Sequence, residues 1–220
     1  ARSVDYVKSV ITMVSELDGE IITLVPATVG KVVPDGTPEE EWKWVVDATK
    51  ECFDHAKKKG VKIAVEPLNR FETYLFNRCA QALALADAVS PECGVCLDAF
   101  HINIEETDMY DAIRLAGDRL FDFHVADNNR FAAGLGQLDW PRIVSTLKEV
   151  GYDGALTNEF VAPVDRTPAT MYPDMVETNP VDISPEQLKF IQDHGSSLLT
   201  EKFYSDQMRI TAETLLPLMK

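Results

Sequence analysis

Four successive strand-like runs of this chain each end in an acidic residue or a histidine, and a helix-like stretch follows each of them. The runs are VKIAVEP, GVCLDAF, LFDFHVAD and GALTNEF, and the side chains concerned are Glu66, Asp98, His124 and Glu159. In a parallel α/β architecture the carboxyl ends of the strands meet on one open face. The pattern therefore predicts a parallel α/β fold in which these four side chains converge.

The remaining patterning predicts one helix followed by five strand–helix units. Apolar residues recur at helical spacing over about 3–18. The stretch 161–184 contains four prolines and no periodicity, which is typical of a long functional loop, and helical pattern continues from Ser184 with a break near Gly195. The expected strands are 21–27, 61–67, 94–100, 120–127 and 154–160, and the expected helices between them are 37–60, 77–89, 107–116 and 140–150.

Strands that alternate with helices imply a parallel sheet. A closed eight-stranded barrel needs three more units, in about 250 residues altogether, and this chain begins with Ala1 and a helix. We therefore expect a single domain over 1–220 that is an α/β parallel (β/α)8 TIM barrel lacking about three N-terminal βα units. The alternative is a five-stranded open sheet.

Strand parity supports the convergence, because alternate residues of a strand point to opposite faces. The candidate ligands of the three middle strands fall on a face of small or polar residues, and the bulky apolar residues fall on the other. The strand at 154–160 is less regular, since Asn158 falls on the outer face. In the run 120–125 we expect one face to carry Asp122 and His124 and the other to carry Phe121, Phe123 and Val125.

The charge balance excludes several classes of partner. The 220 residues include 36 acidic and 21 basic side chains, for a net charge of −15. Proteins that bind nucleic acids carry a basic patch, so we expect neither nucleic acid nor an anionic membrane surface as partner. No run is long and apolar enough to span a bilayer, and no secretory signal pattern is present. The cytoplasm is the default location.

The four cysteines predict no disulfide scaffold. Cys93 and Cys96 have C-x-x-C spacing, but no second pair stands at the spacing of a zinc site. Cys96 lies inside a predicted strand, so we expect it to pack as a small apolar residue. The converging set instead offers three carboxylates and one imidazole. Such ligands favour Mn²⁺, Mg²⁺ or Co²⁺ over Zn²⁺.

Longer strings carry a family resemblance. VEPLNRFET, LDAFHINIEE, HVADNNR and NEF resemble the ketose 3-epimerases of the D-tagatose/D-psicose 3-epimerase type, in the xylose-isomerase-like TIM-barrel superfamily. The resemblance covers roughly 20–160. It implies one divalent metal ion, Mn²⁺ first and Co²⁺ or Mg²⁺ next, bound by Glu66, Asp98, His124 and Glu159. It also implies that the two glutamates are the acid/base pair and that Glu72, His101 and Arg130 contact the sugar.

The expected reaction is therefore metal-dependent epimerisation of a free keto-sugar at C3 through an enediolate, with two carboxyl groups on opposite sides of the substrate plane. An aldose–ketose or hydroxypyruvate-type isomerase on the same scaffold is the alternative. A phosphodiester hydrolase and a non-catalytic binder are two further readings. We also expect a homo-oligomer, a dimer or a tetramer. Each site residue has a structural alternative: a helix cap, an ion pair or a core histidine.

Overall fold

The computed structural model describes residues 2–31, 33–161, 184–186 and 201–220. Five strands form one parallel sheet in sequence order. The predicted loop at 161–184 and the break near Gly195 fall almost wholly outside the described residues. The strands are β1 (Ile21–Leu24), β2 (Lys62–Val65), β3 (Gly94–Asp98), β4 (Leu120–Val125) and β5 (Leu156–Asn158).

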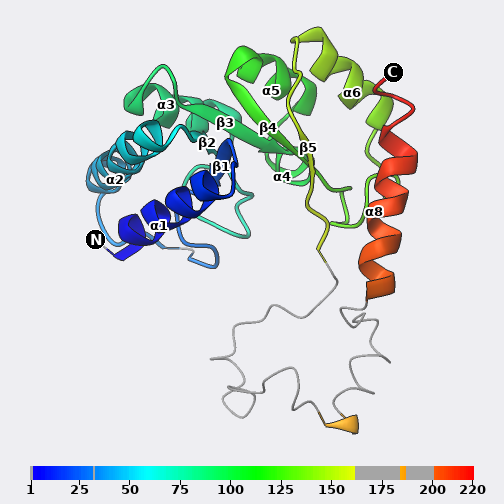
Figure 1. Ribbon diagram of the computed structural model, residues 1–220, viewed down its shortest axis with the longest axis horizontal. Helices are drawn as coiled ribbons and strands as arrows, with labels where there is room; N and C mark the ends of the chain where they lie inside the picture. The colour runs from blue at the N-terminus through cyan, green and yellow to red at the C-terminus, as the bar shows by residue number, and fades with distance from the viewer. Residues whose placement is uncertain (1, 32, 162–183, 187–200) are drawn as a thin grey trace.

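Helices alternate with the strands, as the sequence predicts (Figure 1). They bury apolar residues of the sheet in one core that contains Ile63, Val65, Val95, Leu97 and Phe123. Among the described residues, no helix is long and apolar enough to cross a membrane. The helices are α1 (Arg2–Glu16), α2 (Pro38–Lys59), α3 (Cys79–Val89), α4 (Ala99–Glu105), α5 (Met109–Ala116), α6 (Trp140–Glu149) and α8 (Glu201–Leu215), with a 3₁₀ turn, η1 (Gly117–Arg119).

Local signals set the bounds of α2. Thr37 Oγ1 accepts the backbone N–H of Glu40, and the Glu40 carboxylate accepts the backbone N–H of Thr37, so the predicted capping box is present. At the other end Gly60 adopts a left-handed conformation with φ of 71°, which costs glycine little. The helix thus ends immediately before β2 and fixes where that strand starts.

The predicted strand at 94–100 is two residues too long. Asp98 accepts the backbone N–H of Phe100 at 2.9 Å and caps α4, a helix that the sequence patterning did not predict. A side-chain oxygen at this position satisfies one of the free N–H groups of the first turn. The strand therefore turns into a helix at the candidate ligand Asp98 itself.

The parity prediction was wrong for Phe121. The register pairs Val95 with Leu120 and Cys96 with Asp122, so Phe121 is the extra residue of a β-bulge. Its ring lies where a side chain at Gly94 would stand, and the Lys62 Nζ lies 5.6 Å from the ring centre. Phe121 consequently shares a face with the small and polar residues. Beyond the bulge the alternation resumes with Asp122 and His124 on that same face.

Candidate metal centre

The structure brings the four predicted ligands together at the carboxyl ends of the strands. Glu66 follows β2, Asp98 ends β3, His124 lies in β4 beside Asp98, and Glu159 follows β5. Each offers one ligand atom, and these atoms all lie within 4.8 Å of one another. Three of the four residues are buried, and Glu159 is partly exposed. The convergence predicted from the strand ends is thus present.

The His124 ring is held with one nitrogen toward the cluster. Its Nδ1 lies 3.2 Å from Glu66 Oε1 and 3.0 Å from Glu159 Oε2. Its Nε2 lies 3.3 Å from Asp122 Oδ2, and Asp122 accepts the Thr157 hydroxyl at 2.7 Å. A carboxylate behind a histidine fixes the orientation of the ring at metal sites. Parity placed Asp122 on this face, but its role in orienting His124 was missed.

The electrostatics of the cluster favour a cation. Burial is the largest cause that raises the pKa of Glu66, and its Oε1 is a buried oxygen with no hydrogen-bond partner. Burial opposes protonation of His124, but the neighbouring side chains of Asp122, Cys96, Glu159 and Glu66 raise its pKa overall. The surrounding carboxylates thus draw positive charge onto the imidazole. Three carboxylates, one imidazole and an unpartnered oxygen fit a divalent metal ion.

Arg130 approaches the cluster from the loop after β4. Its guanidinium forms an ion pair with Asp98 Oδ2, and its Nη1 lies 3.5 Å from Glu159 Oε2. The guanidinium carbon lies 4.5 Å from the centre of the Phe100 ring, which it faces in a cation–π contact. Burial is the main cause that raises the pKa of Asp98 well above its ordinary value. Arg130, which the sequence predicts to contact the sugar, therefore lies directly beside the predicted ligands Asp98 and Glu159.

The backbone of Arg130 is unusual, because its φ is 65° in a region that costs a non-glycine residue free energy. The loop around it is organised by Asp127, which is fully buried. Its carboxylate accepts hydrogen bonds within the loop, from the backbone N–H groups of Asn128, Gly134 and Leu138 and from the Trp140 indole.

His101 and Glu72 lie on the side of Asp98 that faces β2. His101 is 1% exposed, and burial, with Arg130 next in effect, lowers its pKa to about 3, so it is neutral at physiological pH. Its Nδ1 accepts the backbone N–H of Asn69 at 3.2 Å, which leaves the ring proton on Nε2, 3.6 Å from Asp98 Oδ2. Asn69 also donates to Glu72 Oε1 at 3.0 Å. Asn69 was missed as a linking residue, although it stands inside the VEPLNRFET string.

The loop that carries Asn69 and Glu72 is fastened to α4. Arg70 donates to both oxygens of Glu105 at 2.9 Å, and its backbone N–H donates to the same carboxylate at 2.6 Å. Glu105 is 4% exposed, so this bidentate pair is shielded on the carboxylate side. Two-point pairing of arginine with a carboxylate fixes geometry as well as adding energy. The loop after β2 and the helix after β3 therefore hold one another in place.

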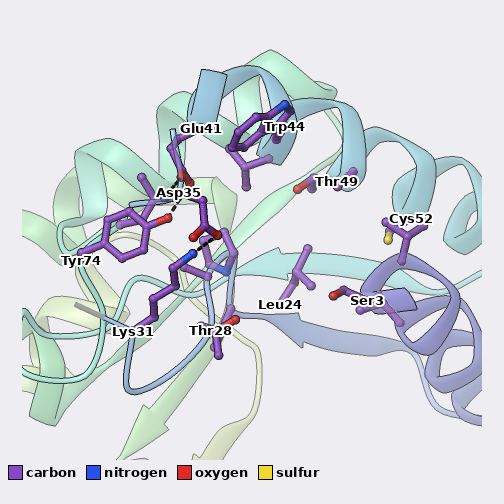
Figure 2. Close-up of a pocket in the computed structure, with 18 residues that line it drawn as sticks. Ser3, Leu24, Thr28, Lys31, Asp35, Glu41, Trp44, Thr49, Cys52 and Tyr74 are labelled. Atoms are coloured by element: carbon purple, nitrogen blue, oxygen red, sulfur yellow. Dashed lines mark hydrogen bonds and ion pairs between the residues drawn. The ribbon is translucent and has the colours of Figure 1, made fainter. Parts of the chain in front are cut away.

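A separate cavity of about 430 Å³ lies between the end of β1, α1 and α2 (Figure 2). Its charged side chains all have partners: Tyr74 donates to Glu41 at 2.5 Å, and Lys31 forms an ion pair with Asp35. Glu41 also accepts the backbone N–H groups of Asp35 and Gly36. None of the seven predicted site residues lines this cavity.

The fold and the cluster agree with a sequence comparison. A family model described as xylose isomerase-like TIM barrel matches residues 1–194, and the chain belongs to this family. Its five parallel strands are part of such a barrel, as predicted. The D-psicose 3-epimerase of Enterocloster bolteae is 41% identical over 111 residues, which cover 50% of this chain and 37% of that protein. The D-psicose 3-epimerase of Agrobacterium fabrum is 33% identical over 151 residues, which cover 68% and 51%.

Solved structures give the same picture. An L-ribulose 3-epimerase superposes with a TM-score of 0.71 at 27% identity, over 96% of this chain and 71% of the other. The D-allulose 3-epimerase of Methylomonas sp., in complex with D-allulose, superposes with a TM-score of 0.69 at 28% identity, over 86% and 68%. The chain spans about half the length, or less, of the two D-psicose 3-epimerases that it matches. The relatives are ketose 3-epimerases, and the buried cluster is consistent with the metal dependence of such enzymes.

Proposed function

We propose that this chain carries the metal-binding and proton-transfer residues of a ketose 3-epimerase. The reaction is epimerisation of a free keto-sugar at C3 through an enediolate. The observation that carries the proposal is the cluster of Glu66, Asp98, His124 and Glu159, whose ligand atoms lie within 4.8 Å of one another. The similarity to D-psicose and L-ribulose 3-epimerases supports the choice of reaction.

The proposed ligands are these same four residues, and the proposed ion is Mn²⁺, with Co²⁺ or Mg²⁺ as substitutes. A bound divalent ion supplies stabilisation of the negative charge that develops on the substrate oxygens. Neighbouring groups hold two of the proposed ligands in position for the ion. Asp98 is fixed by the Phe100 N–H, and His124 is fixed through Asp122.

Inversion at C3 needs one group that removes a proton and another that returns one to the opposite face. Glu66 follows β2 and Glu159 follows β5, two strands that are not neighbours, and each places a carboxylate oxygen near His124 Nδ1. Such a placement supports their use as the acid/base pair about a planar intermediate. Which of the two removes the proton depends on the sugar and on the direction of the reaction.

The sugar hydroxyls are the proposed partners of Glu72, His101 and Arg130. His101 is neutral because of its lowered pKa, and its Nε2–H is available as a donor. Arg130 offers a partly buried guanidinium beside the cluster, suited to an oxygen that gains negative charge. The predicted homo-oligomer and the cytoplasmic location stay predictions.

The test is an incubation of the full-length protein with Mn²⁺ and D-fructose, D-tagatose or L-ribulose, with products resolved by chromatography. We expect C3-epimeric ketoses as products. Glu159→Gln is expected to lower the turnover number at least about a thousandfold, because it removes one proton-transfer group. Glu41→Gln, in the separate cavity, is the matched control and is expected to keep its turnover. Aldose products alone would establish the isomerase alternative. Full turnover by Glu159→Gln would refute the mechanism.

A further inference from the structure

Cys96 lies beside the cluster on the same strand as Asp98. The two residues are two positions apart in β3, so their side chains share a face, and Cys96 is fully buried. Its Sγ, one carboxylate oxygen of Glu66 and one ring nitrogen of His124 all lie within 4.8 Å of one another. Cys96 therefore packs as a small buried residue, as expected, and it also completes a second group of possible ligands.

Glu66 points to a ligand independently of the cysteine. It is 4% exposed, and its Oε1 has no hydrogen-bond partner. A buried, unpartnered carboxylate oxygen is costly, and a metal ion would satisfy it. Both possible ligand sets contain Glu66 and His124. They differ in what completes them, which is a thiol in one case and two carboxylates in the other.

Cys93 provides the contrast. It is equally buried, but its Sγ lies 3.7 Å from the carbonyl oxygen of Ile63 and 3.9 Å from that of Gly94. Within the part of the chain that the structure describes, no group of possible metal ligands includes it. The C-x-x-C spacing therefore does not form a two-cysteine site.

We propose that Cys96, Glu66 and His124 form a second ligand set that binds a thiophilic divalent ion, Zn²⁺ or Cd²⁺, in competition with the hard ion of the carboxylate set. A thiolate selects soft and borderline ions, and three protein ligands with an open fourth position are an established arrangement for zinc. The thiolate and the carboxylate together balance the charge of the divalent ion, and the neutral imidazole adds none. This balance suits a site whose three ligand residues are all buried.

Metal binding releases protons to solvent. The Cys96 thiol loses one as the sulfur–metal bond forms, and the His124 ring, which is protonated in the metal-free chain, loses one as the nitrogen–metal bond forms. Because Glu66 and His124 are shared, an ion seated on Cys96 removes two of the four ligands from the carboxylate set. The inference does not depend on the proposed epimerase activity, since it concerns only which ions the chain binds and through which atoms.

The first test is a Cd²⁺ titration of the metal-free full-length chain, followed by the ultraviolet charge-transfer absorption of cadmium–thiolate bonds. We expect a band that corresponds to one thiolate per bound Cd²⁺ in the wild type. Cys93→Ser, the same substitution in a buried cysteine outside the set, is expected to keep the band, and Cys96→Ser is expected to lose it. Cys96→Ala replaces Cys96→Ser if the latter does not fold.

The second test starts from the Mn²⁺-loaded chain and adds Cd²⁺ while free Mn²⁺ is followed by electron paramagnetic resonance. We expect release of Mn²⁺ together with the thiolate band, and at least about tenfold more Cd²⁺ to be required in Cys96→Ser, because the soft ligand is gone. Absence of the band in the wild type, or its persistence in Cys96→Ser, would overturn the proposal. A band that forms while all Mn²⁺ stays bound would also overturn it. None of these three results would affect the proposed epimerase activity, which is judged by its products.

Discussion

Two regions of this molecule gather charged and polar side chains, and they differ in how those side chains are satisfied. In the cavity beside β1, Glu41 accepts hydrogen bonds from Tyr74 and from two backbone N–H groups, and Lys31 pairs with Asp35. In the strand-end cluster, carboxylates outnumber the cationic groups around them, and Glu66 Oε1 has no hydrogen-bond partner.

The difference separates a structural polar network from a candidate site. Buried polar groups normally find partners within the protein, and the cavity follows that rule. The cluster departs from it in one direction, toward excess negative charge, and the raised pKa of His124 reports the same excess. A bound cation would therefore balance the charge of the cluster, whereas the charges of the cavity network are already paired.

The largest expected effect is on metal affinity. We expect Glu66→Gln and Asp98→Asn each to weaken Mn²⁺ binding at least about a hundredfold, or about 2.7 kcal/mol, because each removes an anionic ligand. Glu41→Gln is expected to leave the affinity unchanged. Titration calorimetry of the three variants measures this. Equal weakening in Glu41→Gln would break the distinction between the two regions.

A satisfied carboxylate near the cluster should behave like those of the cavity. Burial by itself raises the pKa of Asp127, but hydrogen bonds from Trp140 and three backbone N–H groups outweigh it and lower the pKa. We expect Asp127→Ala to lower the free energy of unfolding at pH 7 by about 2–3 kcal/mol, because it leaves buried donors unpaired.

The sign of the pH dependence follows from the lowered pKa. The carboxylate contributes fully above the ordinary aspartate pKa of about 4, and its contribution is lost as the pH falls through the lower value of the folded state. The difference in stability between wild type and Asp127→Ala should therefore shrink as the pH falls below about 4 in urea titrations. A constant difference over this range would contradict the assignment.

The third expected effect is on the melting temperature of the metal-free chain, which the same substitution should change differently in the two regions. Glu66→Gln removes a buried charge that lacks a full set of partners, so we expect its melting temperature to equal or exceed that of the wild type. Glu41→Gln weakens a network in which each oxygen has a partner, and its melting temperature should fall. Calorimetric scans in the presence of a chelator compare the two. A large loss of stability in Glu66→Gln would show that its carboxylate is structural.

The smallest effect is that of Tyr74→Phe. Burial and the hydrogen bond to Glu41 raise the pKa of Tyr74 to about 12, and the substitution removes that bond alone. We expect a loss of about 1 kcal/mol in the free energy of unfolding and an unchanged affinity for Mn²⁺. Denaturant unfolding and a metal titration measure both. A change in affinity would mean that the cavity network is coupled to the cluster.

Much of the cluster could be predicted because strand ends are readable. Glu66, Asp98 and His124 each follow a short apolar run, and in a parallel sheet such positions meet at one edge. Glu159 was also brought to the cluster, although the polar Asn158 falls on the outer face of the predicted strand and β5 ends before Glu159. A residue's position at the end of its strand, more than the face of the sheet to which its side chain points, decided whether it reaches the cluster.

The sequence-based errors arose where the local structure departs from a regular strand or a long helix. Parity assumes a regular strand, so the bulge at Phe121 could not be seen from alternation alone. α4 has only seven residues, too few for helical periodicity to show. The pairing of Arg130 with Asp98 depends on a left-handed backbone in a loop, and no periodic pattern encodes such a conformation.

The cap of α4 has a wider consequence. One oxygen of Asp98 accepts the Phe100 N–H, and the other faces Arg130 and His101. His101 sits in the first turn of the same helix, so any displacement of α4 carries both residues along as a unit. Under the proposed function, we therefore expect substrate preference to change through loops that are not tied to this helix, while the aspartate–histidine pair keeps its spacing.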